Sequence, residues 1–378
     1  MSPIVYYPRI ETNQLRSLLA GWRARYPESG ALVLLPEAEA ARLPMLQAVC
    51  RESSVPLVGA LFPALIQNAA FVTQGIWLLR LDRMPPVGLL AEINAPGGDP
   101  AERMAAVIAT QLTEDRSTLL MVFDTMILNI ASILDGLYLQ LADRVRYVGV
   151  SAGSETFQPM PCLFDQDRLV HNGVLWLLLS EELTAIIEHG YQAPAKMLTA
   201  TSTEGNRIIS IDWRPAFTVY QELLQTQYGI ALSTDNFYAH AIHFPFGILR
   251  ANNEVIVRIP VAVEADGSVF CTGEIPANAI LTLLEASQID SGYTVNHIVQ
   301  SLTELHGSMT DRTLLTFYCA GRRLHLGSGA QVELVDLSAK TTVACLAGAL
   351  SLGEIGNSCE WGYPLFHNAA LVCMDWPA

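Results

Sequence analysis

Apolar positions in the first half of the chain recur with two different spacings. In residues 13–25 they recur every three or four residues, which predicts a helix, whereas residues 30–35 form a short apolar run that predicts a buried strand. Both kinds of segment continue in turn, with helices expected at 37–52, 101–112 and 127–143 and strands at 56–60, 74–81, 118–123 and 146–150. This alternation predicts a mixed α/β fold in which helices cover mixed sheets.

The second half of the chain is expected to add an antiparallel part. The dipeptide Asp266-Gly267 separates the strand-like residues 254–263 from residues 268–272, which is typical of a β-hairpin. Residues 199–206 are polar and typical of a turn, and they mark a change in the texture of the chain.

The length of 378 residues exceeds the usual size of a single hydrophobic core. The change from alternating helix-like and strand-like segments to a polar, turn-rich stretch after residue 191 indicates a boundary between two cores. We therefore expect two layered domains, residues 1–195 and residues 196–378, that meet along a sizeable interface.

Hydrophobic residues make up 51% of the chain and charged residues 16%, so a membrane protein has to be considered. The longest apolar run is residues 174–179, far short of the roughly 20 residues that a membrane-spanning helix needs. Residues 1–9 lack the charged start and apolar stretch of a signal peptide. We expect a soluble, cytoplasmic protein that does not bind membranes.

The formal net charge of −15 argues against nucleic acid as a partner, because binding phosphates requires clustered Lys and Arg. The longest basic run that we identify is the dipeptide Arg322-Arg323. The seven cysteines form no C-x-x-C pair and are expected to be reduced core residues: Cys50, Cys162, Cys271, Cys319, Cys345, Cys359 and Cys373.

Several segments, read in order, are similar to the motifs of one family. In the first half they are residues 57–63 (LVGALFP), 149–154 (GVSAGS) and 188–191 (EHGY). In the second half they are residues 212–220 (DWRPAFTVY), 244–248 (FPFGI), 254–258 (EVIVR), 319–322 (CAGR), 348–356 (GALSLGEIG) and 367–368 (HN). Together, from roughly residue 30 to 374, they resemble the FIST_N and FIST_C domains.

This resemblance implies a bacterial sensory module that binds a small ligand and is not an enzyme. The chain is similar to the stand-alone NosP-like branch, which binds haem, senses nitric oxide and regulates a partner histidine kinase or cyclic-di-GMP enzyme. The alternative is a FIST module for an amino acid or another small metabolite. Self-association into a homo-oligomer is compatible with the sequence.

A haem-based sensor needs one strong protein ligand on the iron inside an apolar pocket. His189 ranks first as that metal ligand, because it carries the family match and is expected to end a helix over residues 182–188. Its structural alternative is a histidine stabilised by the dipole of that helix. His243 ranks second, because residues 239–246 are rich in aromatic side chains.

Two further charged residues are candidates for ligand contact. Arg322 is expected either to clamp a carboxylate or haem propionate or to pair internally with an acid such as Glu354. Glu354 stands alone among apolar residues and is itself a candidate for ligand binding. His240 and His243 are three residues apart, but a zinc site would need a third ligand, which the neighbouring sequence does not offer.

Residues 149–154 allow two different interpretations. We expect a tight backbone turn rather than a phosphate loop, because neither the Walker A nor the Rossmann glycine pattern is present. They also spell the G-x-S-x-G pattern around Ser151, so a serine hydrolase is a second alternative. The two prolines in residues 155–161 argue against the helix that this pattern requires.

Overall fold

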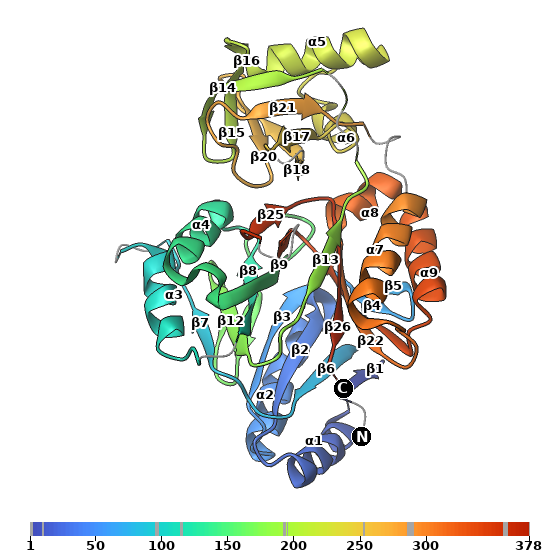
Figure 1. The fold of residues 1–378 in the computed structure, drawn as a ribbon. Coiled ribbons are helices and arrows are strands. Elements are labelled where there is room, and N and C mark those ends of the chain that lie inside the picture. The colour runs from blue at the N-terminus through green and yellow to red at the C-terminus, as the bar shows by residue number, and fades with distance from the viewer. Residues whose placement is uncertain are drawn as a thin grey trace.

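The computed structural model describes residues 3–9, 11–94, 98–113, 116–191, 194, 196–251, 254–285, 291–357 and 362–377. They form a body, made of the residues up to 191 and from 291 onwards, and a cap, made of the described residues between 196 and 285. Figure 1 shows the cap stacked on one end of the body, with both chain termini near the opposite end.

The first sheet of the body contains the earliest strands of the chain. Its strands lie in the order β1 (Ile4–Tyr7), β6 (Ile76–Leu81), β2 (Gly30–Pro36), β3 (Leu57–Phe62), β10 (Leu163–Asp165) and β11 (Leu169–Val170). Strands β2 and β3 are parallel, and the other pairs are antiparallel. The helices α1 (Thr12–Arg25) and α2 (Leu43–Glu52) belong to the same hydrophobic cluster as this sheet, because α1 buries Leu15, Leu19 and Trp22 on one face.

The second sheet joins the middle of the chain to two C-terminal strands. Its strands lie in the order β25 (Leu365–His367), β24 (Glu354–Gly356), β9 (Val145–Ala152), β8 (Ser117–Asp124), β12 (Val174–Leu179) and β7 (Val87–Leu90). The helices α3 (Pro100–Ala109) and α4 (Ile130–Leu141) pack on it. Helix α3 begins where Asp99 accepts a hydrogen bond from the backbone N–H of Ala101 at 2.8 Å.

The third sheet combines strands from three distant parts of the chain. Its order is β13 (Ala185–Glu188), β26 (Leu371–Trp376), β22 (Thr313–Cys319), β23 (Cys345–Ser351), β4 (Leu65–Gln67) and β5 (Ala70–Val72). The helices α7 (Ser291–His306), α8 (Ala320–Leu326) and α9 (Gly329–Thr341) lie against it (Figure 1). Inner faces of all three sheets contribute to one hydrophobic core, which therefore holds both halves of the chain together.

The cap is an antiparallel sheet covered by α5 (Ala216–Tyr228) and α6 (Phe237–Ala241). The sheet order is β18 (Val255–Arg258), β17 (Phe246–Leu249), β21 (Ile280–Leu283), β14 (Leu198–Glu204), β15 (Arg207–Ile211), β20 (Val269–Cys271) and β19 (Pro260–Val263), with β16 (Arg214–Pro215) beside β15. The expected hairpin is confirmed, because β19 pairs with β20 and the N–H of Glu264 donates to the carbonyl of Ser268 at 2.9 Å.

The mixed α/β class is confirmed, whereas two local predictions are wrong. Residues 182–188 form no helix; the β-branched Ile186 and Ile187 lie in β13, which pairs with β26. Residues 149–152 form no turn, because β9 continues to Ala152 and only then does Gly153 adopt a positive φ of 132°. The helical stretch expected over 37–52 is a 3₁₀ helix (Glu37–Arg42) followed by α2, and a second 3₁₀ turn, Ala142–Arg144, follows α4.

The predicted domain boundary falls at residue 195, which lies outside the described residues, as does Cys359. The division into 1–195 and 196–378 therefore stays a prediction. Among the described helices, none combines the length and the apolar character that crossing a membrane requires.

Candidate functional site

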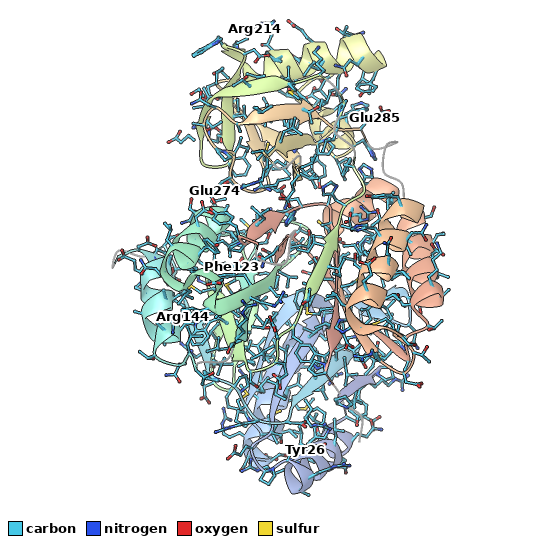
Figure 2. The ribbon with its side chains drawn as sticks, in the orientation of Figure 1. Tyr26, Phe123, Arg144, Arg214, Glu274 and Glu285 are labelled. Atoms are coloured by element: carbon cyan, nitrogen blue, oxygen red, sulfur yellow. The ribbon has the colours of Figure 1, made fainter. Side chains whose placement is uncertain are left out.

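Five of the segments with family-like motifs meet where the cap contacts the body, a region that we call the seam: residues 188–191, 254–258, 319–322, 348–356 and 367–368. In the cap it involves residues 254–274, and in the body the ends of β22, β24 and β25. The guanidinium of Arg258 donates to the carbonyl of Phe366 at 3.0 Å, and the hydroxyl of Thr272 donates to Asn368 at 3.1 Å. Glu274, labelled at the seam in Figure 2, accepts hydrogen bonds from the backbone and hydroxyl of Ser132.

A cavity of about 20 Å³ lies in the seam. Its walls come from both the cap and the body. They include Tyr238, Ile242, Ile259 and Thr272 of the cap and Cys319, Gly321, Leu352 and Asn368 of the body. A volume of this size holds about one water molecule. The cavity is therefore a closed junction between two surfaces rather than a preformed pocket for a large group.

Glu354 is completely buried beside this cavity, on β24. Burial raises its pKa to about 8, although hydrogen bonds that include one from Ser351 at 2.6 Å oppose the rise. The carboxyl group is therefore mostly protonated at neutral pH, and it contributes little negative charge to the seam.

His367 lies directly opposite Glu354 in the antiparallel pair of β24 and β25. The imidazole is 4% exposed, and neither ring nitrogen has a hydrogen-bond partner among the described residues. Burial, assisted by the proximity of His189 and by the positive charges of Arg258 and Arg250, lowers its pKa to about 3. The ring is therefore neutral and keeps one free donor and one free acceptor.

Arg322 forms an internal ion pair, one of the two roles expected for it, but its partner is Glu333 rather than Glu354. Its guanidinium donates to both carboxylate oxygens of Glu333, at 2.8 and 2.6 Å, and to Thr294 and the carbonyls of His189 and Ala369. Burial alone would lower the pKa of Arg322, but the hydrogen bonds and charge of Glu333 raise it. All five N–H donors are used, so Arg322 has none to spare for a ligand.

His189 follows the edge strand β13, and both of its ring nitrogens are engaged. Nδ1 accepts the backbone N–H of Tyr191 at 3.0 Å, so the proton is on Nε2, which donates to the carbonyl of Val255 at 2.9 Å. Burial lowers the pKa of His189 to about 4. Gly190, the next residue, has a positive φ of 73°.

His243 is connected to His189 through a row of neighbouring rings. The ring centres of His189 and Tyr191 are 5.8 Å apart, those of Tyr191 and His325 are 5.6 Å apart, and those of His325 and His243 are 5.5 Å apart. Burial, together with the nearby His240, lowers the pKa of His243. The two predicted haem ligands thus lie at opposite ends of one row, and sequence reasoning missed Tyr191 and His325 between them.

The residues of the seam do not fit a haem in this conformation. Iron ligation by His189 would require one of its two hydrogen bonds to break, and pockets for cofactors occupy about 300 Å³ or more. A zinc site is not supported either, since no group of three His, Cys, Asp or Glu side chains among the described residues could hold a metal ion. Haem ligation by His189 stays a prediction.

Ser151 lacks the geometry of a hydrolase nucleophile. It lies inside β9, is completely buried, and its backbone N–H donates to the carbonyl of Gly353 at 2.8 Å. Residues 153–162 are all described and contain no helix, whereas a nucleophile elbow joins a strand to a helix. The structure therefore gives the hydrolase alternative no support.

Arg258 lies in the family-like segment 254–258, but the sequence did not predict it as a site residue. It is 3% exposed, and burial lowers its pKa to about 10. The sequence did contain a signal, because Arg258 is the single cation within the otherwise apolar, strand-like residues 255–259.

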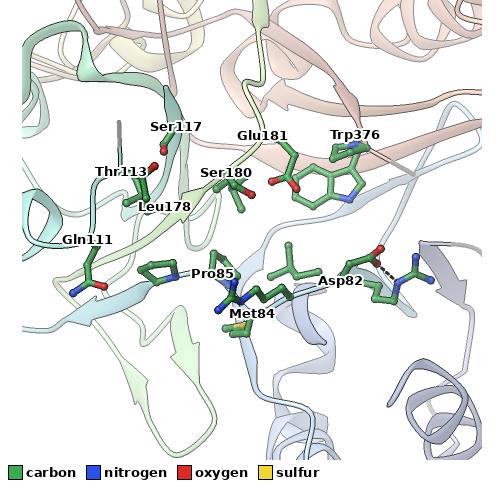
Figure 3. A pocket seen from close by; sticks show the side chains of 16 residues that line it. Asp82, Met84, Pro85, Gln111, Thr113, Ser117, Leu178, Ser180, Glu181 and Trp376 are labelled. Carbon is green, nitrogen blue, oxygen red and sulfur yellow. Dashed lines mark hydrogen bonds and ion pairs between the residues drawn. The ribbon is translucent and has the colours of Figure 1, made fainter. Parts of the chain in front are cut away.

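A larger groove, of about 640 Å³, lies elsewhere in the body, between residues 80–86 and the ends of β12 and β26. Figure 3 shows Trp376, Glu181 and Asp82 around it. Its arginines are already paired, since Arg80 donates to Asp82 at 2.6 Å and Arg83 pairs with Glu28 at 3.0 Å. Despite its size, it contains no predicted site residue, and we place the candidate site at the seam.

Comparison with known families agrees with the family-like motifs of the sequence. A model of the FIST N domain matches residues 31–214, and a model of the FIST C domain matches residues 216–357. No curated protein matches the sequence. FIST domains are sensory domains of signal transduction. The two matches cover most of the chain, and the protein belongs to the FIST family.

Proposed function

We propose that this protein is a sensor that binds a small organic metabolite in the seam between cap and body. The observation that carries the proposal is the cavity whose walls come from both the cap and the body. Buried polar groups without hydrogen-bond partners lie next to it. A ligand held there contacts cap and body at once. If the ligand binds one arrangement of cap and body more tightly than another, it shifts the equilibrium towards the arrangement that it binds more tightly.

The signal needs no chemical step in this chain. A change in the position of the cap alters the surface that a partner protein contacts, and a histidine kinase or a cyclic-di-GMP enzyme is the partner that the family resemblance suggests. The polar contacts across the seam are weak enough to be exchanged, because a neutral hydrogen bond contributes only about 1 kcal/mol and one to a charged group about 1.5–3 kcal/mol.

A haem-based nitric oxide sensor is the competing form of this proposal. The row of rings from His189 to His243 favours it, while the two hydrogen bonds of His189 and the small cavity disfavour it. The two forms differ in colour, because only the haem protein absorbs strongly in the visible range.

The test combines an absorption spectrum with a thermal-shift screen of amino acids and central metabolites. We expect colourless protein from haem-supplemented cells and a Tm that rises with at least one metabolite. Thr272→Val removes the hydroxyl that bridges the seam and is expected to reduce this rise. Thr303→Val, on the exposed side of α7, is the matched control and is expected to keep it.

Two results would overturn the proposal. A Soret band that disappears in His189→Ala would establish the haem sensor instead. An equal rise in Tm for Thr272→Val, Thr303→Val and the wild type would place the ligand away from the seam.

A further inference from the structure

The seam contains a buried cation, Arg258, that forms no ion pair among the described residues, although the charge of Glu274 acts on it from a distance and raises its pKa against the effect of burial. Nε of Arg258 donates to the carbonyl of Glu274 at 2.9 Å, and Nη1 donates to the carbonyls of Val257 and Phe366 at 3.0 Å each. Among the described residues, Nη2 has no hydrogen-bond partner and no carboxylate forms an ion pair with this guanidinium. The carboxylate of Glu274 is directed to Ser132 instead.

Arg322 is a second buried arginine, and its role is structural. Arg322 is completely buried, and Glu333 neutralises it through two hydrogen bonds. A buried charge without such a partner costs several kcal/mol, so proteins seldom keep one without a reason. A negative group from outside the chain would serve Arg258 as Glu333 serves Arg322.

A second unsatisfied donor lies beside Arg258. Phe366, whose carbonyl accepts from Arg258, is followed by His367, and neither ring nitrogen of His367 has a partner among the described residues. The neighbouring Glu354 accepts from Ser351 and is mostly protonated, so it does not supply the missing charge. Unsatisfied donors thus lie beside Arg258, and among the described residues no carboxylate is hydrogen-bonded to its guanidinium.

A further arginine stands at the outer edge of this region. Arg250 follows β17, is exposed, and lies with its guanidinium 5.6 Å from the ring centre of Tyr363. It forms no ion pair among the described residues. Since the whole chain carries a net charge of −15, these two arginines form a local positive site on an acidic protein.

We infer that the seam binds a small carboxylate, with its anionic group between Nη2 of Arg258 and the imidazole of His367 and with Arg250 at the entrance. One guanidinium nitrogen and a neutral imidazole match a single negative charge. A phosphate dianion would keep an unbalanced charge in a medium of low polarity. The inference rests on the proposed function and specifies its ligand class; the small cavity means that the seam opens to admit the ligand.

The experiment compares propanoate with propanamide, which has nearly the same shape and no charge. We expect propanoate to raise the Tm of the wild type in a concentration-dependent way and propanamide to leave it unchanged. Arg258→Met is expected to weaken the binding of propanoate at least tenfold, and Arg258→Lys to weaken it less. Arg16→Met, which changes an exposed arginine on α1, is the control and keeps wild-type binding.

Because Arg258→Met removes a buried side chain and could fail to fold, Arg250→Met provides a second test at an exposed position. It is expected to weaken propanoate binding several-fold and to reduce its dependence on salt. Equal shifts with propanoate and propanamide, or unchanged binding in Arg250→Met and Arg258→Met, would overturn the inference. If a neutral metabolite shifts the wild type but not Thr272→Val while propanoate has no effect, the seam is the ligand site and only the carboxylate assignment fails.

Discussion

At the scale of single residues, the buried polar groups of this protein fall into two kinds. Arg322, Glu333 and Tyr318 satisfy one another, since Tyr318 also donates to Glu333 at 2.6 Å. Arg258 and His367 keep free donors among the described residues. The first kind stabilises the fold, and the second is available to a ligand.

Removing the acid of the satisfied cluster is expected to be severe. Glu333→Ala leaves the buried guanidinium of Arg322 without its counter-charge, and we expect the free energy of unfolding to fall by about 3–5 kcal/mol. Urea denaturation measures this change. Asp336→Ala, which breaks the exposed pair with Lys340 on the same helix, is the control and should cost about 1 kcal/mol or less.

The raised pKa of Glu354 predicts a pH dependence of stability. Its pKa in the folded protein is about 8, against an ordinary value of 4.5, so the unfolded chain releases this proton at lower pH than the folded one. The contribution of the group to stability is therefore fully present below pH 4.5 and is lost as the pH rises towards 8. The Glu354→Gln variant does not lose this contribution. Its Tm, measured relative to the wild type at the same pH, should therefore rise as the pH increases from 5 to 8. A constant difference across this range would contradict the assignment.

At the scale of elements, the parallel pair β22 and β23 depends on one close backbone approach. Gly348 lies opposite Thr316 with a φ of 154°, and a Cβ atom there would lie 1.7 Å from the carbonyl oxygen of Thr316. Because that atom belongs to the backbone of a central strand, it cannot move aside. The glycine-rich segment 348–356 is thus required for sheet packing as well as for the seam.

Gly348→Ala is therefore expected to destabilise the protein by more than about 3 kcal/mol or to abolish soluble expression. Gly329→Ala is a suitable comparison, since the nearest atom to its added Cβ would be 3.7 Å away and the residue begins a helix. It should be neutral or slightly stabilising, by up to about 1 kcal/mol. Equal stabilities of the two variants by denaturant unfolding would contradict this account.

At the scale of the whole molecule, the cap and the body are held together by side-chain contacts across the seam. Glu274 binds the first turn of α4 through Ser132, and Thr272 binds Asn368 close to β25. These contacts lie between the main core of the cap and the core shared by the three sheets of the body. A smaller apolar cluster also spans the seam, in which Ala369 of the body packs with Val257 and Ile259 of the cap. Movement of the cap relative to the body therefore costs less free energy than disruption of either core.

Glu274→Ala is expected to loosen the seam without unfolding the protein. Amide exchange should accelerate at least several-fold around Ser132 and residues 272–274, while the core strands β8 and β22 keep their protection. Hydrogen-exchange mass spectrometry measures the difference. Uniform acceleration throughout the body would show instead that the substitution lowers global stability.

The sequence alone determined the class of fold, most elements and the family. These depend on the period of apolar residues, on turn residues such as Asp266-Gly267 and on ordered motifs, all of which are local properties of the chain. The sequence also placed Glu354 and Arg322 among the candidates. It failed at residues 182–188, because a short apolar segment becomes a strand only when an edge such as that of β26 is available to pair with it.

Only the tertiary structure decided which charges neutralise one another. Arg322 and Glu333 meet because α8 and α9 both lie against the third sheet, and His189 loses its free nitrogens because β13 brings it to Val255 of the cap. Arg258 remains without a carboxylate because Glu274, from the same part of the cap, is directed to Ser132 across the seam. Electrostatic pairing depends on distances between groups from separate elements, and the linear pattern of the chain does not contain those distances.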